Sequence, residues 1–167
     1  MGISKKGQFA NKRFCDITGF QQPKNGNDPR GDAFLGNVWV EIKAGTYNQV
    51  RPYHYSVLVG YNNELDEWYV IPPHDVLSMT KNKRGQHTTN PMECMNNSKV
   101  KSKKYQPYKV SVSDLKSKVL EAYQEGENRP FMKALANRKK AEFEMAPKIN
   151  TEEVEEAERQ ERENVAQ

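Results

Sequence analysis

The stretch GDAFLGNVWVEIKAG, residues 31–45, constrains the fold most, because two charged residues interrupt an otherwise apolar segment. Glu41 and Lys43 are two positions apart, and side chains two apart on a strand point to the same face. Burying either charge without a partner would cost several kcal/mol. The sequence therefore predicts a buried strand whose charges have a compensating partner, for which a metal ion is one candidate.

The remaining pattern predicts an α/β domain. Short apolar stretches read as strands, and Gly36-Asn37 is a common hairpin dipeptide between the first two. Thr46 begins a short helical stretch that Pro52 limits, and Gly126 is expected to terminate a later helix. We expect a mixed central sheet flanked by helices and followed by helical C-terminal segments. The expected elements are a basic helix over 4–17, strands at 33–36, 38–44, 55–61 and 67–73, a short helix from 74, and helices after 113.

The charge is distributed unevenly along the 167 residues. The chain carries a net charge of +4, but residues 151–167 contain seven Glu and two Arg, a net charge of −5. Residues 1–150 therefore carry +9, which is suited to binding a polyanion. With 35% hydrophobic residues and 29% charged residues, the chain is expected to form one domain with a modest core.

Several classes of protein are disfavoured by what the sequence lacks. It has no run of 18 apolar residues, and its first residues do not form the apolar segment of a signal peptide. Cys15 and Cys94 are 79 positions apart and form no CxxC pattern, so neither a disulfide framework nor a zinc site is indicated. We expect a soluble protein located in the cytoplasm, with no membrane partner.

Asp32, Glu41 and Lys43 are the candidate catalytic residues. Two carboxylates from adjacent strands can converge across a hairpin as hard oxygen ligands for Mg²⁺. A lysine on the same strand face can act on the attacking water and offset charge on a phosphate. Asp32 could instead be only a turn residue, and Glu41 with Lys43 could be a surface ion pair on an edge strand.

GDA…VEIKAG resembles the motif of the PD-(D/E)XK nuclease superfamily, in which an Asp is followed by (D/E)xK. Asp32, Glu41 and Lys43 match its three charged positions, while Arg30-Gly31 stand where the nominal Pro would be. The resemblance covers roughly residues 28–75. It implies a restriction-endonuclease-like fold and a nuclease core, placed at 1–110. The helical pattern and the charge run that follow predict a helical extension over 111–147 and an acidic helical or disordered tail over 148–167.

The same resemblance implies a Mg²⁺-dependent endodeoxyribonuclease of the restriction, homing or defence type. Asp32 and Glu41 would bind Mg²⁺, for which Mn²⁺ could substitute, Lys43 would assist the attacking water, and Gln49 would lie beside them. Since one such site cuts one strand, we expect a homodimer or a higher homo-oligomer for double-strand cleavage. Two alternatives remain, namely a structure-selective nuclease such as a Holliday-junction resolvase and a non-catalytic DNA-binding module.

Basic residues after the motif are candidates for phosphate contacts with DNA. Each could equally be a solubilising or structural residue, and Gln49 could be a solvated helix residue. His54 and His74 show no metal-ligand spacing and are expected to have no role in the site. The candidates are Arg51, Lys81, Lys83, Arg84 and His87.

Overall fold

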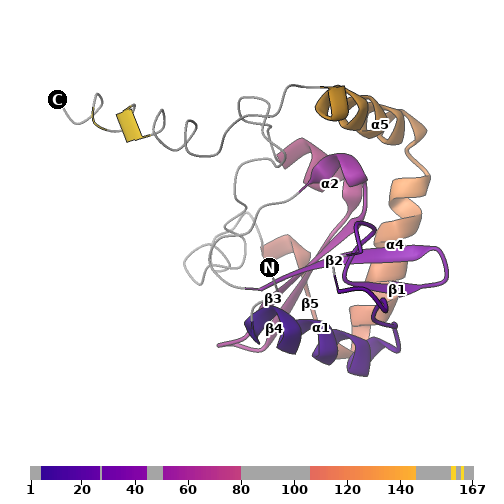
Figure 1. The fold of residues 1–167 in the computed structure, drawn as a ribbon. Coiled ribbons are helices and arrows are strands. Elements are labelled where there is room, and N and C mark those ends of the chain that lie inside the picture. Colours follow the sequence, from indigo (N-terminus) through magenta and orange to yellow (C-terminus); the bar gives the residue numbers. More distant parts are fainter. Residues whose placement is uncertain are drawn as a thin grey trace.

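A computed structural model gives the fold of the chain, and it describes residues 5–26, 28–44, 51–79, 106–145, 159, 160 and 163. The elements follow one another along the chain as shown in Figure 1. They are α1 (Lys5–Thr18), β1 (Ala33–Leu35), β2 (Val38–Ala44), η1 (Pro52–His54), β3 (Val57–Asn62), β4 (Glu67–Ile71), α2 (Pro73–Met79), η2 (Gln106–Tyr108), β5 (Lys109–Val110), η3 (Val112–Asp114), α4 (Leu115–Glu127) and α5 (Pro130–Met145).

The five strands form one mixed sheet with the order β1-β2-β3-β4-β5. The β2–β3 pair is parallel, and the three other pairs are antiparallel. Gly36, with φ of 58°, occupies the tight turn between β1 and β2, as the Gly-Asn dipeptide predicted. The prediction of an α/β fold with a mixed central sheet and flanking helices is confirmed.

One face of the sheet packs against α1 and α4. Val40 and Ile42 of β2 point to this face together with Trp68 of β4, and Phe14 of α1 and Leu115 of α4 lie in the same apolar cluster. These side chains are at most 6% exposed, and together they form the main core. Because α4 supplies part of this core, it belongs to the same packed body as the sheet.

The opposite face of the sheet carries the candidate site. Leu58 and Ile71 are buried on this face, because they alternate along β3 and β4 with the residues of the main core. Tyr53 of η1 and Val76 of α2 are also buried outside the main core cluster, and α2 contacts β3. The sheet is therefore enclosed by α1 and α4 on one side and partly covered by η1 and α2 on the other.

Gly126 lies one residue before the end of α4 at Glu127, so the predicted helix end is correct to within one residue. It is buried where α4 approaches the start of α2 and the residues before β3. A Cβ at this position would lie 3.0 Å from Cγ of Pro73 and 3.3 Å from Cε2 of Tyr55. The glycine therefore permits close packing inside the helix, and Asn128 follows as the C-cap.

None of the helices in the described ranges could cross a membrane. They are too short or too polar, and the longest of them, α5, has 16 residues that include several charged side chains.

Candidate functional site

Glu41 and Lys43 lie side by side on the sheet face that η1 and α2 partly cover. In the parallel pairing of β2 with β3, Glu41 is opposite Leu58 and Lys43 is opposite Gly60. Lys43 Nζ is 3.3 Å from Glu41 Oε1, and the side chains of Lys43 and Glu41 are 22% and 32% exposed. The ion pair exists and is partly exposed, and β1 pairs with β2 only as far as Val40, so the alternative of a surface ion pair stays open for Glu41 and Lys43.

Asp32 forms hydrogen bonds with β2 at the residues directly before and after Glu41. Its backbone N–H donates to the carbonyl of Val40 at 2.9 Å, and its Oδ2 accepts a hydrogen bond from the N–H of Ile42 at 2.8 Å. β1 begins only at Ala33, so the carboxylate satisfies a donor of β2 beyond the end of the paired segment. Asp32 therefore does more than shape a turn.

Gly31 makes this close approach possible. Its φ is 151°, and a Cβ there would lie 2.6 Å from the carbonyl oxygen of Val40. A distance this short is not tolerated without a shift of the backbone, so any larger residue would push Asp32 away from β2. This steric restriction explains why a glycine occupies position 31, directly before Asp32.

The three charged groups interact electrostatically. Burial raises the pKa of Asp32 to about 6, and the negative charge of Glu41 acts in the same direction. The hydrogen bond from Ile42 and the positive charge of Lys43 oppose this rise. The structure therefore brings together Asp32, Glu41 and Lys43, as the sequence predicted.

A divalent cation is compatible with this donor set. The negative charge of Glu41 helps to raise the pKa of Asp32, and a bound cation would offset this repulsion. Mg²⁺ usually takes only one or two carboxylates, with waters and substrate phosphates as further ligands. Within the described residues, no group of three or more His, Cys, Asp or Glu side chains could enclose a metal ion. Asp32 and Glu41 could supply two carboxylate ligands, and waters or phosphate oxygens would have to supply the rest.

His54, which sequence reasoning set aside, lies within electrostatic range of this site. It is half-buried on η1, and its imidazole hydrogen-bonds to the backbone of Pro29. Burial lowers the pKa of His54, as do the positive charges of Lys140 and Arg51, whereas Glu41 acts to raise it. Only the packing of α5 against η1 brings Lys140 here, so no local motif could have revealed this cluster.

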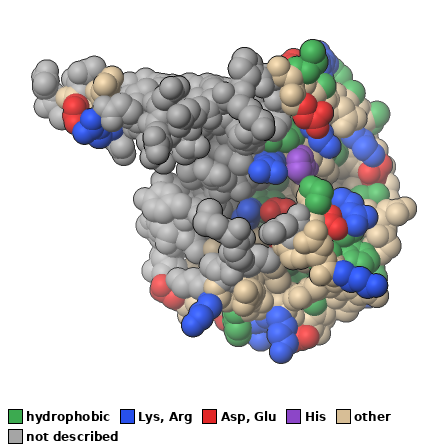
Figure 2. Space-filling view, viewed as in Figure 1, with side chains coloured by type: hydrophobic (Ala, Val, Ile, Leu, Met, Phe, Trp, Pro, Cys, Tyr) green, Lys and Arg blue, Asp and Glu red, His purple; other side chains and the backbone are tan. Residues whose placement is uncertain are grey.

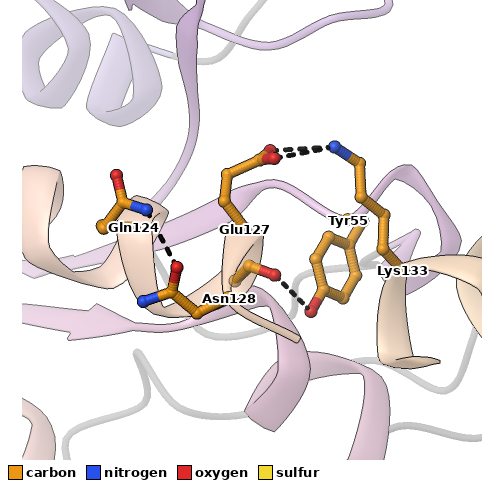
Figure 3. Close-up of polar contacts among 6 residues, drawn as sticks. Tyr55, Gln124, Glu127, Asn128 and Lys133 are labelled. Atoms are coloured by element: carbon orange, nitrogen blue, oxygen red, sulfur yellow. Dashed lines mark hydrogen bonds and ion pairs between the residues drawn. The ribbon is translucent and has the colours of Figure 1, made fainter. Parts of the chain in front are cut away.

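Tyr55 anchors η1 to the C-terminal helices. It has a left-handed backbone conformation, with φ of 53°, and its hydroxyl donates to the carbonyl of Gly126 at 3.2 Å. Figure 3 shows this contact beside the Gln124–Asn128 hydrogen bond and the ion pair between Glu127 and Lys133. The Tyr55–Gly126 contact joins the residue after His54 to α4, while the other two contacts lie within and between α4 and α5.

The remaining predicted residues divide into two groups. Arg51 is exposed and immediately precedes η1, near His54. Gln49, Lys81, Lys83, Arg84 and His87 lie outside the described residues. Figure 2 shows that acidic and basic side chains meet in a hollow of the face drawn there, with a histidine nearby.

Comparison with known proteins gives no relative on which to rest an assignment. No protein-family model matches the chain, and neither characterised proteins nor solved structures show a significant match to it.

Proposed function

We propose that the protein is a metal-dependent DNA endonuclease that hydrolyses phosphodiester bonds. The observation that carries the proposal is the convergence of Asp32, just before the start of β1, with Glu41 and Lys43 of β2. Two carboxylates and a lysine, partly open to solvent on one sheet face, provide both cation ligands and a group that can act on phosphate or water. The resemblance to the PD-(D/E)XK motif points in the same direction.

In the proposed reaction, Asp32 and Glu41 would hold Mg²⁺, or Mn²⁺ in its place. Such an ion would supply Lewis-acid stabilisation of the charge that develops on the phosphate oxygens. Lys43 Nζ, which lies 3.3 Å from Glu41, donates a hydrogen bond to the attacking water and orients it. The water oxygen bonds to phosphorus and loses a proton to solvent, the bond from phosphorus to the leaving oxygen breaks, and the leaving oxygen takes up a proton from solvent.

DNA binding is attributed to the positive charge around this site. The positive charges of Arg51 and Lys140 act on His54, as does the negative charge of Glu41. Residues 1–150 carry a net charge of +9, which favours binding of a polyanion whatever the base sequence of the DNA. A homodimer would place two such sites on the two strands of a duplex.

The proposal is tested by incubating the purified protein with supercoiled, linear and branched DNA, in Mg²⁺, in Mn²⁺ and in EDTA. We expect nicking or cleavage with either metal ion and none with EDTA. DNA binding without any metal-dependent cleavage would instead identify a non-catalytic DNA-binding module.

A further inference from the structure

A stack of flat side chains stands beside the candidate site on the β1–β2 hairpin. The rings of Phe34 and Trp39 are stacked, with centroids 4.7 Å apart and an interplanar angle of 23°. The guanidinium of Arg30 lies over the Trp39 ring, 4.3 Å from its centroid. The described residues therefore include a continuous stack formed by an arginine and two aromatic rings.

Arg30 is held flat in this stack by Asp28. Its Nε and Nη2 donate to the two carboxylate oxygens of Asp28 at 3.0 and 2.8 Å, and the Arg30 backbone N–H donates to Oδ1 at 3.0 Å. The bidentate contact involves the edge of the guanidinium and leaves its faces for stacking. The Arg30 side chain is 66% exposed, so the stack ends at the protein surface.

The stack and the candidate site share one face of β2. Trp39 and Glu41 are two residues apart on this strand and therefore point to the same side, as does Lys43. A separation of two residues along a strand is roughly 7 Å, about the length of two base steps in a stacked nucleic-acid strand. The neighbouring Val40 and Ile42 point to the core instead.

A surface stack of this kind has a known physical use in nucleic-acid binding. Arginine planes and aromatic rings bind unstacked bases, because every base has a flat π-face. In a fully paired duplex the base faces are covered by their neighbours, so a side-chain stack gains little from it. Ordinary packing of the hairpin would account for Phe34 on Trp39, but it does not require an exposed arginine held rigidly above them.

We propose that Arg30, Trp39 and Phe34 form a binding site for an unpaired base next to the phosphate that is cut. The proposal rests on the proposed function and narrows it to DNA that contains single-stranded or branched segments. It favours a structure-selective nuclease over an enzyme that reads a paired sequence.

The test measures binding of one labelled DNA strand in EDTA, presented alone, in a duplex with an unpaired internal loop, and in a fully paired duplex. We expect wild type to bind the two unpaired forms about tenfold more tightly than the duplex, as stacking of one base provides. Trp39→Leu should abolish this preference, and Trp39→Phe should keep most of it. Arg30→Lys retains the positive charge but loses the planar guanidinium group. It should therefore weaken the preference for unpaired DNA without changing how the affinity depends on salt.

Tryptophan fluorescence gives a second readout. The chain has two tryptophans, and Trp68 is fully buried in the main core, where it reports folding. Unpaired DNA should quench the emission of wild type and leave that of Trp39→Phe, which comes from Trp68, unchanged. An unaltered Trp68 spectrum also shows that Trp39→Leu is folded.

The outcomes separate this inference from the proposed function when Mg²⁺-dependent cleavage is measured on the same samples. Cleavage with equal binding of paired and unpaired DNA would overturn the base site and leave the nuclease proposal standing. Preference for unpaired DNA without cleavage would support the base site and refute the nuclease. A Trp39→Leu variant that is folded and still prefers unpaired DNA would also overturn the base site.

Discussion

The side chain of Asp32 accepts a hydrogen bond at 2.8 Å from the backbone N–H of Ile42, the residue that separates Glu41 from Lys43. One carboxylate is thereby fixed to the strand that carries the other. Because the bond uses a backbone donor, it depends on how closely the chain before β1 approaches β2. The position of Asp32 is therefore determined by local packing as well as by charge.

The first prediction concerns that close approach. Gly31→Ala should lower the free energy of unfolding by about 2 kcal/mol, because the added Cβ would lie 2.6 Å from the Val40 carbonyl. It should also reduce DNA cleavage, since Asp32 is displaced. Urea unfolding and a cleavage assay check both effects.

Gly36→Ala is the matched control for this change. Gly36 also has a positive φ, of 58°, but nothing lies within 4 Å of the position its Cβ would occupy. We expect a loss of about 1 kcal/mol from backbone strain alone and unchanged cleavage. Equal effects of the two substitutions on cleavage would show that Gly31 does not position Asp32.

The second prediction concerns pH and the stability of the metal-free protein. The pKa of Asp32 is raised to about 6 in the folded state, against about 3.9 in an unfolded chain. Between these values the folded state binds more protons, so the free energy of unfolding should fall as the pH rises from about 4 to 6. At neutral pH, Asp32→Asn should therefore be more stable than wild type, by on the order of 2 kcal/mol, with no difference below pH 4.

The measurement is urea unfolding of wild type and Asp32→Asn in EDTA across this pH range. Adding Mg²⁺ at neutral pH should then stabilise wild type more than the variant, because the cation binds the folded carboxylate pair. If Asp32→Asn is the less stable protein at neutral pH, Asp32 is a favourable structural charge and the electrostatic account is wrong.

Much of the fold follows from local patterns in the sequence. The alternation of apolar and polar residues in 38–44 predicts β2 at its observed bounds, and Gly36-Asn37 predicts the hairpin turn. The basic amphipathic stretch at the N-terminus predicts α1 to within one residue at each end. The convergence of the three charged residues was predictable because a hairpin joins their strands.

The rest of the site depends on contacts between distant segments. His54 comes close to Lys140 because η1 packs on α5. The two residues are more than 80 positions apart in the chain. Gly126 predicts the end of α4 to within one residue, but its close packing against Pro73 and Tyr55 could not be predicted from the residue type. Such tertiary contacts leave no periodic signal in one sequence.

The third prediction separates Lys43 from residues that only hold DNA. Lys43→Ala should slow single-turnover cleavage by about 100-fold or more, because it removes a group directed at the attacking water, while affinity changes little. Lys140→Ala should instead weaken binding and reduce the slope of affinity against salt by about one unit. Binding is measured in Ca²⁺ across a salt series.

Lys116→Ala serves as the control for Lys140→Ala. Lys116 is exposed on α4, the helix that packs on the sheet face opposite the candidate site. We expect it to alter neither the salt slope nor the cleavage rate. An equal loss of binding and cleavage in Lys43→Ala would make Lys43 a phosphate anchor rather than a catalytic residue.

The carboxylate pair is tested most directly by the single-turnover rate of plasmid nicking in Mg²⁺, compared between wild type, Asp32→Asn and Glu41→Gln. Each substitution removes one negative charge and keeps the shape of the side chain, so both variants should fold and bind DNA as tightly as wild type or more tightly. The account predicts metal-dependent nicking by wild type that falls to the level of the EDTA control in both variants. Nicking at the wild-type rate by either folded variant would contradict it.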